Sequence, residues 1–198
     1  MTEVAGDGGG AAAVTHVLAI RHGETDWNAQ QRLQGHTDIP LNAKGAEQAR
    51  RLAEALHDQT LHAIYSSDLS RAKATAEALA RRVGLVVYQD AALRERGFGS
   101  FEGLTYAEVE QRWPEEAERW RRRDLSFAPP GGETLPQFHE RCVQALLKFA
   151  RAHAGQTIAV VAHGGVLDAW YRAASRAGLL APRTWQMPNA AINRLMVA

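Results

Sequence analysis

One segment, Leu18-Ala19-Ile20-Arg21-His22-Gly23, constrains this chain more than any other. An apolar run of this length that ends at a glycine predicts a buried strand of a parallel sheet. Such sheets bind ligands at the carboxyl ends of their strands, which is where Arg21 and His22 are expected. The guanidinium favours the neutral, nucleophilic form of the neighbouring imidazole and offers a fork of donors to a phosphate. The segment therefore predicts phosphoryl transfer through a phosphohistidine.

Strand-like and helical patterns alternate along the rest of the chain. Apolar runs that predict strands occur at 16–21, 63–66, 85–88, 157–162 and 192–197. Helical spacing begins behind Asn42, an expected N-cap, and recurs over 69–83, 135–153 and 164–177. This alternation predicts an α/β fold: a three-layer sandwich with a mainly parallel central sheet flanked by helices, plus a short helical cap segment.

We expect a single domain over 15–198, because the sequence contains no internal repeat, linker or second core. Residues 1–14 are rich in glycine and alanine and are expected to form a flexible tail. The segment 99–133 interrupts the alternation. Its short helical stretches, broken by proline and glycine, fit an inserted cap over the ligand-binding edge or, equally well, a solvated surface excursion.

The overall charge is balanced, with 23 Lys and Arg against 22 Asp and Glu, so neither nucleic acid nor membrane is expected as a partner. A basic region followed by an apolar stretch is absent from the start of the sequence, and the cytoplasm is the expected location. The eight histidines show no HxH or HExxH spacing, and Cys142 is the only cysteine. We therefore expect no metal and no cofactor, and Cys142 is expected in the core. Nothing in the sequence indicates an oligomeric state.

Five blocks of residues carry a resemblance to a known family. Arg21-His22-Gly23-Glu24-Thr25 with Trp27-Asn28 is the first, and the others are 34–49, 66–72, 94–103 and 162–165. In this order they resemble the blocks of the histidine phosphatase superfamily, whose members include phosphoglycerate mutases. The resemblance covers roughly residues 17 to 168.

The resemblance implies a role for several residues at the ligand-binding edge. His22 would be the nucleophile, Arg21 and Arg71 would clamp the phosphate, and His163 would contact the same phosphate. Glu95 would be the general acid and base, although spacing alone leaves Glu24 and Glu102 as rivals. The candidates for substrate binding are Asn28, Gln34, Gly35, Arg96 and Gly164. His36 is expected near this site.

Three functions are compatible with these residues. The first is a metal-independent phosphomonoesterase that acts on a small phosphorylated metabolite, and the length of the chain favours this compact branch. The second is a phosphoglycerate mutase, which would use the same phosphohistidine; Arg96 and 121–123 partly match mutase positions. Phe98 and Tyr106, however, replace the tyrosine and lysine typical of mutases in this family. The third is a non-catalytic phospho-ligand binding module, against which the presence of both His22 and Glu95 argues.

Overall fold

The computed structural model describes residues 13–198. We expected a flexible tail over residues 1–14. Most of it, residues 1–12, lies outside the residues that the structure describes. Within residues 13–198, no helix combines the length and apolar character that crossing a membrane requires.

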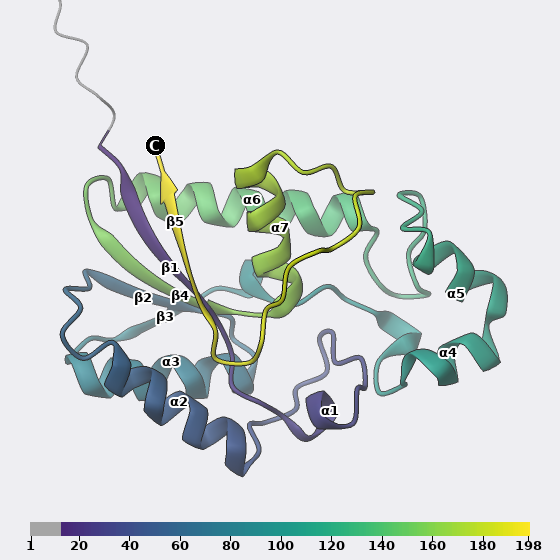
Figure 1. The fold of residues 1–198 in the computed structure, drawn as a ribbon, viewed down its shortest axis with the longest axis horizontal. Helices are drawn as coiled ribbons and strands as arrows, with labels where there is room; N and C mark the ends of the chain where they lie inside the picture. The colour runs from purple at the N-terminus through teal and green to yellow at the C-terminus, as the bar shows by residue number, and fades with distance from the viewer. Residues whose placement is uncertain (1–12) are drawn as a thin grey trace, which may run out of the picture.

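A five-stranded sheet forms the centre of the molecule, in the order β3-β2-β4-β1-β5 (Figure 1). Its strands are β1 (Thr15–Arg21), β2 (Ala63–Ser66), β3 (Val87–Gln89), β4 (Thr157–Ala162) and β5 (Ile192–Val197). The first four are parallel, whereas β5 pairs with β1 in the antiparallel sense at one edge. Arg21 pairs with Ala162, so β1 and β4 end at the same level. The residues that follow these two strands therefore meet at one edge of the sheet.

Four helices cover the two faces of the sheet, as the sequence predicted. They are α2 (Ala43–Ala55), α3 (Ser70–Val83), α6 (Leu135–Ala152) and α7 (Gly164–Ser175). Alternate residues of β1 point to opposite faces: Val17 packs in the core with α6 and α7, and Leu18 in the core with α2 and α3. Asn42 caps α2 through a 2.8 Å bond to the amide of Gly45. Cys142 lies in the α6 core, as expected.

The third strand begins two residues later than predicted. We expected a strand at 85–88, but β3 spans Val87–Gln89. Gly84 ends α3 in the left-handed conformation, and the amide of Leu85 still bonds to the carbonyl of Ala80 at 3.1 Å. Since this amide completes the end of the helix, it cannot also pair with β2, and the strand begins later.

The segment between β3 and α6 projects to one side of the three layers (Figure 1). It contains α4 (Tyr106–Arg112) and α5 (Pro114–Arg121), and we call 99–133 the cap. The cap has a small core of its own, in which Phe101, Val109, Ala117 and Phe127 are buried. The segment is thus ordered and packs around its own side chains, and its role as a cap over the ligand-binding edge stays a prediction.

Candidate active site

His22 follows the last residue of β1 and is 3% exposed. Its Nδ1 lies 2.6 Å from the carbonyl oxygen of Gly23, and because a carbonyl can only accept, Nδ1 carries the ring proton. Nε2 is then unprotonated, and its lone pair is available to attack an electrophile. Burial, and after it the cationic Arg71 and Arg21, lowers the pKa of His22 well below its usual value. The ring is therefore neutral at physiological pH.

His163 follows β4 and lies beside His22, with the two ring centroids 5.1 Å apart in an edge-on arrangement. Both of its ring nitrogens are buried and lack a hydrogen-bond partner among residues 13–198. Burial, followed by Arg71 and His22, lowers the pKa of His163 well below its usual value. His163 is also the N-cap of α7, so the partial positive charge of that helix terminus adds to the field at this point.

Two arginines complete this part of the site. Arg71 lies in the first turn of α3 and is fully buried, with its Nη1 and Nη2 each 2.9 Å from the carbonyls of Thr37 and Gly35. Arg21 donates from Nη1 to the carbonyl of Met187. The Nε atoms of both arginines are buried without a hydrogen-bond partner in the described part of the chain. Backbone carbonyls thus hold each guanidinium, and the Nε–H group of each remains available to donate to a ligand.

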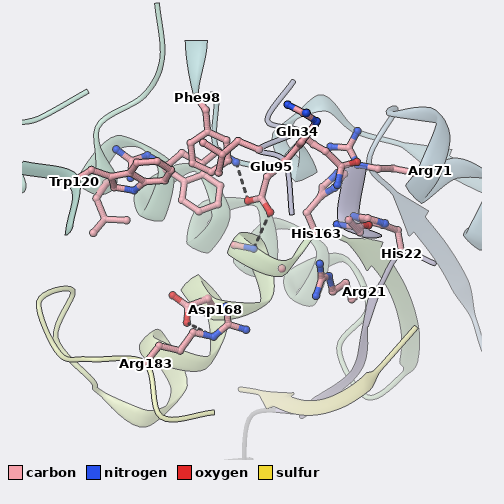
Figure 2. A pocket seen from close by; sticks show the side chains of 18 of the residues that line it. Arg21, His22, Gln34, Arg71, Glu95, Phe98, Trp120, His163, Asp168 and Arg183 are labelled. Carbon is pink, nitrogen blue, oxygen red and sulfur yellow. Dashed lines mark hydrogen bonds and ion pairs between the residues drawn. The ribbon is translucent and has the colours of Figure 1, made fainter. Parts of the chain in front are cut away.

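We call Arg21, His22, Arg71 and His163 the inner end of the site, because all four line one cavity of about 380 Å³ (Figure 2). Buried polar atoms in proteins nearly always have a hydrogen-bond partner. Here the Nε atoms of two arginines and both nitrogens of His163 have none among the described residues. An anion with several acceptor oxygens, such as a phosphate, would accept from the two Nε–H groups and from the one nitrogen of neutral His163 that carries a proton.

Glu95 lines the same cavity and is held by two backbone amides (Figure 2). Its Oε1 accepts from the amide of Arg96 and its Oε2 from the amide of Gly165, both at 2.9 Å. A Cβ built on Gly165 would lie only 2.1 Å from Oε1, so this carboxylate needs a glycine at the start of α7. Glu95 is therefore positioned beside the inner end by groups that fix its orientation.

The two rival acids lie elsewhere. Glu24 accepts from Lys44 at 2.7 Å and from Asn42 at 3.1 Å. Glu102 accepts from the amides of three residues in the loops around it, His36, Thr37 and Phe98. Neither is among the residues that line the cavity, whereas Glu95 is.

The other end of the cavity is built by residues that the sequence analysis did not name as binding residues. Phe98, Trp120 and Arg123 come from the cap and its approach, Asp168 from α7, and Arg183 from the loop before β5. We call these five residues the outer end. Figure 2 labels all of them except Arg123 and shows them apart from His22 and Arg71. Asp168 could have been found, because it lies one helical turn after Gly164 on the same face of α7. No pattern in the sequence indicated Arg183.

The five candidates for substrate binding occupy different places. Asn28, Gln34, Arg96 and Gly164 line the cavity. Gly35 instead supplies the carbonyl that holds Arg71. Arg96 is 7% exposed, and its Nε donates to the carbonyl of Glu133 at 2.9 Å, so it ties the cap to the cavity wall. His36 bonds to the carbonyl of Glu95 at 2.9 Å.

Within the run 121–123, only Arg123 lines the cavity. Arg121 forms ion pairs with Glu110 and Glu118, and Arg122 pairs with Glu118 at 2.6 Å, all on the surface of the cap. Acidic residues of α4 and α5 thus hold Arg121 and Arg122 outward, so of this run only Arg123 is placed to contact a ligand in the cavity.

The cavity wall is strongly cationic. Six arginines line it against two carboxylates, Glu95 and Asp168; the arginines are Arg21, Arg32, Arg71, Arg96, Arg123 and Arg183. No group of three or more His, Cys, Asp or Glu side chains in residues 13–198 is arranged to hold a metal ion. The charge of the wall favours a small, multiply anionic ligand.

The chain is similar to known proteins in both sequence and structure. The family model described as histidine phosphatase superfamily (branch 1) matches residues 17–198. Phosphoglycerate mutase-like protein 4 of Arabidopsis thaliana is 43% identical over 162 residues, covering 80% of this chain and 70% of its own length. A metal-independent phosphoserine phosphatase of the same plant is 41% identical over 162 residues, covering 80% of this chain and 68% of its own. The structure of a mycobacterial glucosyl-3-phosphoglycerate phosphatase in complex with VO3 superposes with a TM-score of 0.81 at 33% identity, over 90% of each chain.

Proposed function

The chain belongs to the histidine phosphatase superfamily, and on that premise we propose that it hydrolyses small phosphorylated metabolites without a metal, through a phosphohistidine formed on His22. The observation that carries this proposal is the 2.6 Å bond from Nδ1 of His22 to the carbonyl of Gly23. It leaves Nε2 of a neutral ring as the nucleophile. In the same cavity, Arg21, Arg71 and His163 have buried nitrogens without partners among the described residues.

In the first step, the lone pair of His22 Nε2 forms a bond to phosphorus, and the bond between phosphorus and the ester oxygen breaks. The electron pair of that bond leaves with the alcohol oxygen, which takes a proton from the carboxylic acid of Glu95. Arg21 and Arg71 balance the negative charge on the three transferring oxygens, and the neutral ring of His163 donates a hydrogen bond to one of them.

In the second step, a water molecule attacks phosphorus and the bond to Nε2 breaks, returning its electron pair to the nitrogen. The carboxylate of Glu95 takes a proton from that water and regains the form needed for the next cycle. The products are the alcohol and inorganic phosphate, and His22 returns to its starting tautomer. Two amides that hold Glu95 in place support its double use.

The cap supports hydrolysis over phosphoryl transfer within a retained substrate. A mutase must hold its substrate under a closed, basic cap that keeps water out. Here Tyr106 packs against Trp120 inside the cap, with ring centroids 5.8 Å apart, and Arg121 pairs with acidic neighbours. A binding module without catalysis is disfavoured, because the nucleophile and the acid both line the cavity. The cytoplasm, where small phosphorylated metabolites are abundant, is the proposed location.

Hydrolysis of p-nitrophenyl phosphate in the presence of EDTA tests the activity. The wild-type chain should release phosphate at the same rate with and without the chelator, and His22→Ala should abolish turnover. His57→Ala is the matched control, because His57 is a surface histidine of which 39% of the side chain is exposed. Isomerisation of 3-phosphoglycerate, measured in parallel, should be far slower than its hydrolysis. Turnover by His22→Ala at the wild-type rate, or faster isomerisation than hydrolysis, would contradict the proposal.

A further inference from the structure

The outer end contains a carboxylate oxygen whose environment is unexplained by the steps above. Asp168 directs Oδ2 toward Arg172, whose Nε is 2.9 Å away. Its other oxygen, Oδ1, is buried and has no hydrogen-bond partner within residues 13–198. A buried, charged oxygen in this state is costly, and such atoms usually acquire a partner in the working complex.

Arg172 fixes the orientation of this carboxylate. Arg172 is 1% exposed and donates from Nη1 to the carbonyls of Gly178 and Ala181, at 2.7 and 3.0 Å. Its guanidinium also lies over the ring of Trp185, 4.9 Å from the centroid. Because Arg172 is held on several sides, Asp168 cannot turn Oδ2 away from it without losing this bond, and Oδ1 stays at the cavity.

Arg183 lies beside Oδ1, and Arg123 lines the same cavity. Arg183 reaches it only to 3.7 Å through Nε, which already donates to the carbonyl of Trp185 at 3.1 Å (Figure 2). Arg123 donates from Nε to the carbonyl of Leu179. The terminal nitrogens of both have no hydrogen-bond partner among the described residues. The outer end therefore offers donors for an anion next to one acceptor for a hydrogen-bond donor.

We propose that Asp168 is a specificity-determining residue. Its Oδ1 accepts a hydrogen bond from an ammonium or hydroxyl group in the alcohol part of the substrate. In the substrate, a carboxylate lies next to this group. The inference rests on the proposed phosphatase activity. Arg123 and Arg183 receive the carboxylate. The substrate class is then the phosphate ester of a small acid with an amino or hydroxyl group next to the carboxylate, bound between two charged ends.

Three esters that differ only at this group test the proposal. O-phosphoserine carries an ammonium, 3-phosphoglycerate a hydroxyl, and the phosphate ester of 3-hydroxypropanoate neither. The wild-type kcat/KM should be at least tenfold higher for one of the first two than for the third.

Asp168→Asn is the decisive variant. Its single amide oxygen can still accept from the buried Arg172, which leaves the NH2 group at the cavity. That group repels an ammonium, whereas a hydroxyl can turn and accept from it. The preference for O-phosphoserine over the propanoate ester should therefore fall about tenfold, while any preference for 3-phosphoglycerate should fall much less. Asp58→Asn, with an aspartate side chain that is 82% exposed, is the matched control for charge and should change neither ratio.

A second variant addresses the carboxylate in case Asp168→Asn fails to fold. Arg183 lies on a loop and its side chain is 39% exposed. Arg183→Ala should lower the kcat/KM of O-phosphoserine relative to phosphoethanolamine, which keeps the ammonium but lacks the carboxylate. An unchanged ratio would overturn the assignment of Arg183.

An equal loss on all three esters in Asp168→Asn would overturn the proposal, because it would mean that Asp168 only holds Arg172 and Arg183. Unchanged ratios in that variant would overturn it as well. The proposed activity fails separately, if the wild-type chain releases phosphate from no ester, including p-nitrophenyl phosphate. Calorimetric affinities of His22→Ala for the three esters, with and without Asp168→Asn, test the same ratios independently of turnover.

Discussion

The inner and outer ends of the cavity are built in different ways. At the inner end, Arg71 and His163 are completely buried. Arg21 is the last residue of the central strand β1, and His22 directly follows it. At the outer end, Arg183 is partly exposed on a loop, and Phe98, Trp120 and Arg123 belong to the cap or its approach. The inner end is therefore rigid and suited to a group common to all substrates, whereas the outer end can vary without disturbing the sheet. We infer that the inner end performs the chemistry and the outer end selects the alcohol.

Glu95 lies between the two ends, and after loss of the nucleophile itself its replacement should have the largest effect on activity. Glu95→Gln keeps the shape but cannot donate a proton, so kcat/KM should fall about a hundredfold on alkyl esters such as glycerol phosphate. The loss should be much smaller on p-nitrophenyl phosphate, whose phenolate leaves without protonation. Equal losses on both esters would give Glu95 a positioning role instead.

A pair of adjacent glycines sharpens this test. A Cβ on Gly165 would lie 2.1 Å from Oε1 of Glu95, whereas a Cβ on Gly164 would meet its nearest atom, Nε of Arg21, at an ordinary 3.5 Å. Gly165→Ala should thus reproduce the leaving-group dependence of Glu95→Gln, and Gly164→Ala should lose less activity, with no such dependence.

Arg71→Lys should lower kcat/KM about tenfold or more, because lysine keeps the charge but cannot hold two carbonyls and still direct a planar donor at phosphate. The loss should be similar for every ester, since the inner end is common to all of them. Arg82→Lys, at an arginine that pairs with Glu54 on the surface, serves as the control. A loss that depended strongly on the alcohol part would break the division between the two ends.

The smallest predicted effect is on stability. Burial is the main cause that lowers the pKa of both His22 and His163 well below the usual 6.5, so the unfolded chain binds protons that the folded chain does not. The free energy of unfolding should therefore decrease as the pH falls below 6.5, by at most about 1.4 kcal/mol per pH unit for each histidine. This loss continues down to the folded-state pKa values.

Urea unfolding between pH 7.5 and 5.5 measures this dependence. His163→Gln should have a shallower slope than the wild-type chain below pH 6.5, and the exposed His57→Gln should not. Identical slopes in His163→Gln and the wild-type chain would show that His163 is not held neutral by the fold. The five residues of the outer end include no histidine, so this pH dependence belongs to the inner end.

The same contrast explains how much the sequence predicted. Each residue of the inner end lies at the end of a strand or the start of a helix, which the alternating pattern predicted. That His22 and His163 meet was implied only by the family resemblance, because the pattern does not give the order of the strands. The cap helices α4 and α5 are short, and their residues pack into a separate core, so periodicity did not reveal their position. The place of Arg183 depends on the path of the loop between α7 and β5, which no local pattern encodes.

The central claim is that the phosphoryl group is carried by His22, and trapping the enzyme during turnover tests it most directly. A substrate with 32P in its phosphate, quenched in alkali within one turnover, should leave an acid-labile label on the peptide that contains His22. The label should disappear at the rate of turnover when unlabelled substrate is added, and it should be absent in His22→Ala. Turnover without a labelled intermediate, or a label on another residue that is lost at the turnover rate, would contradict the account.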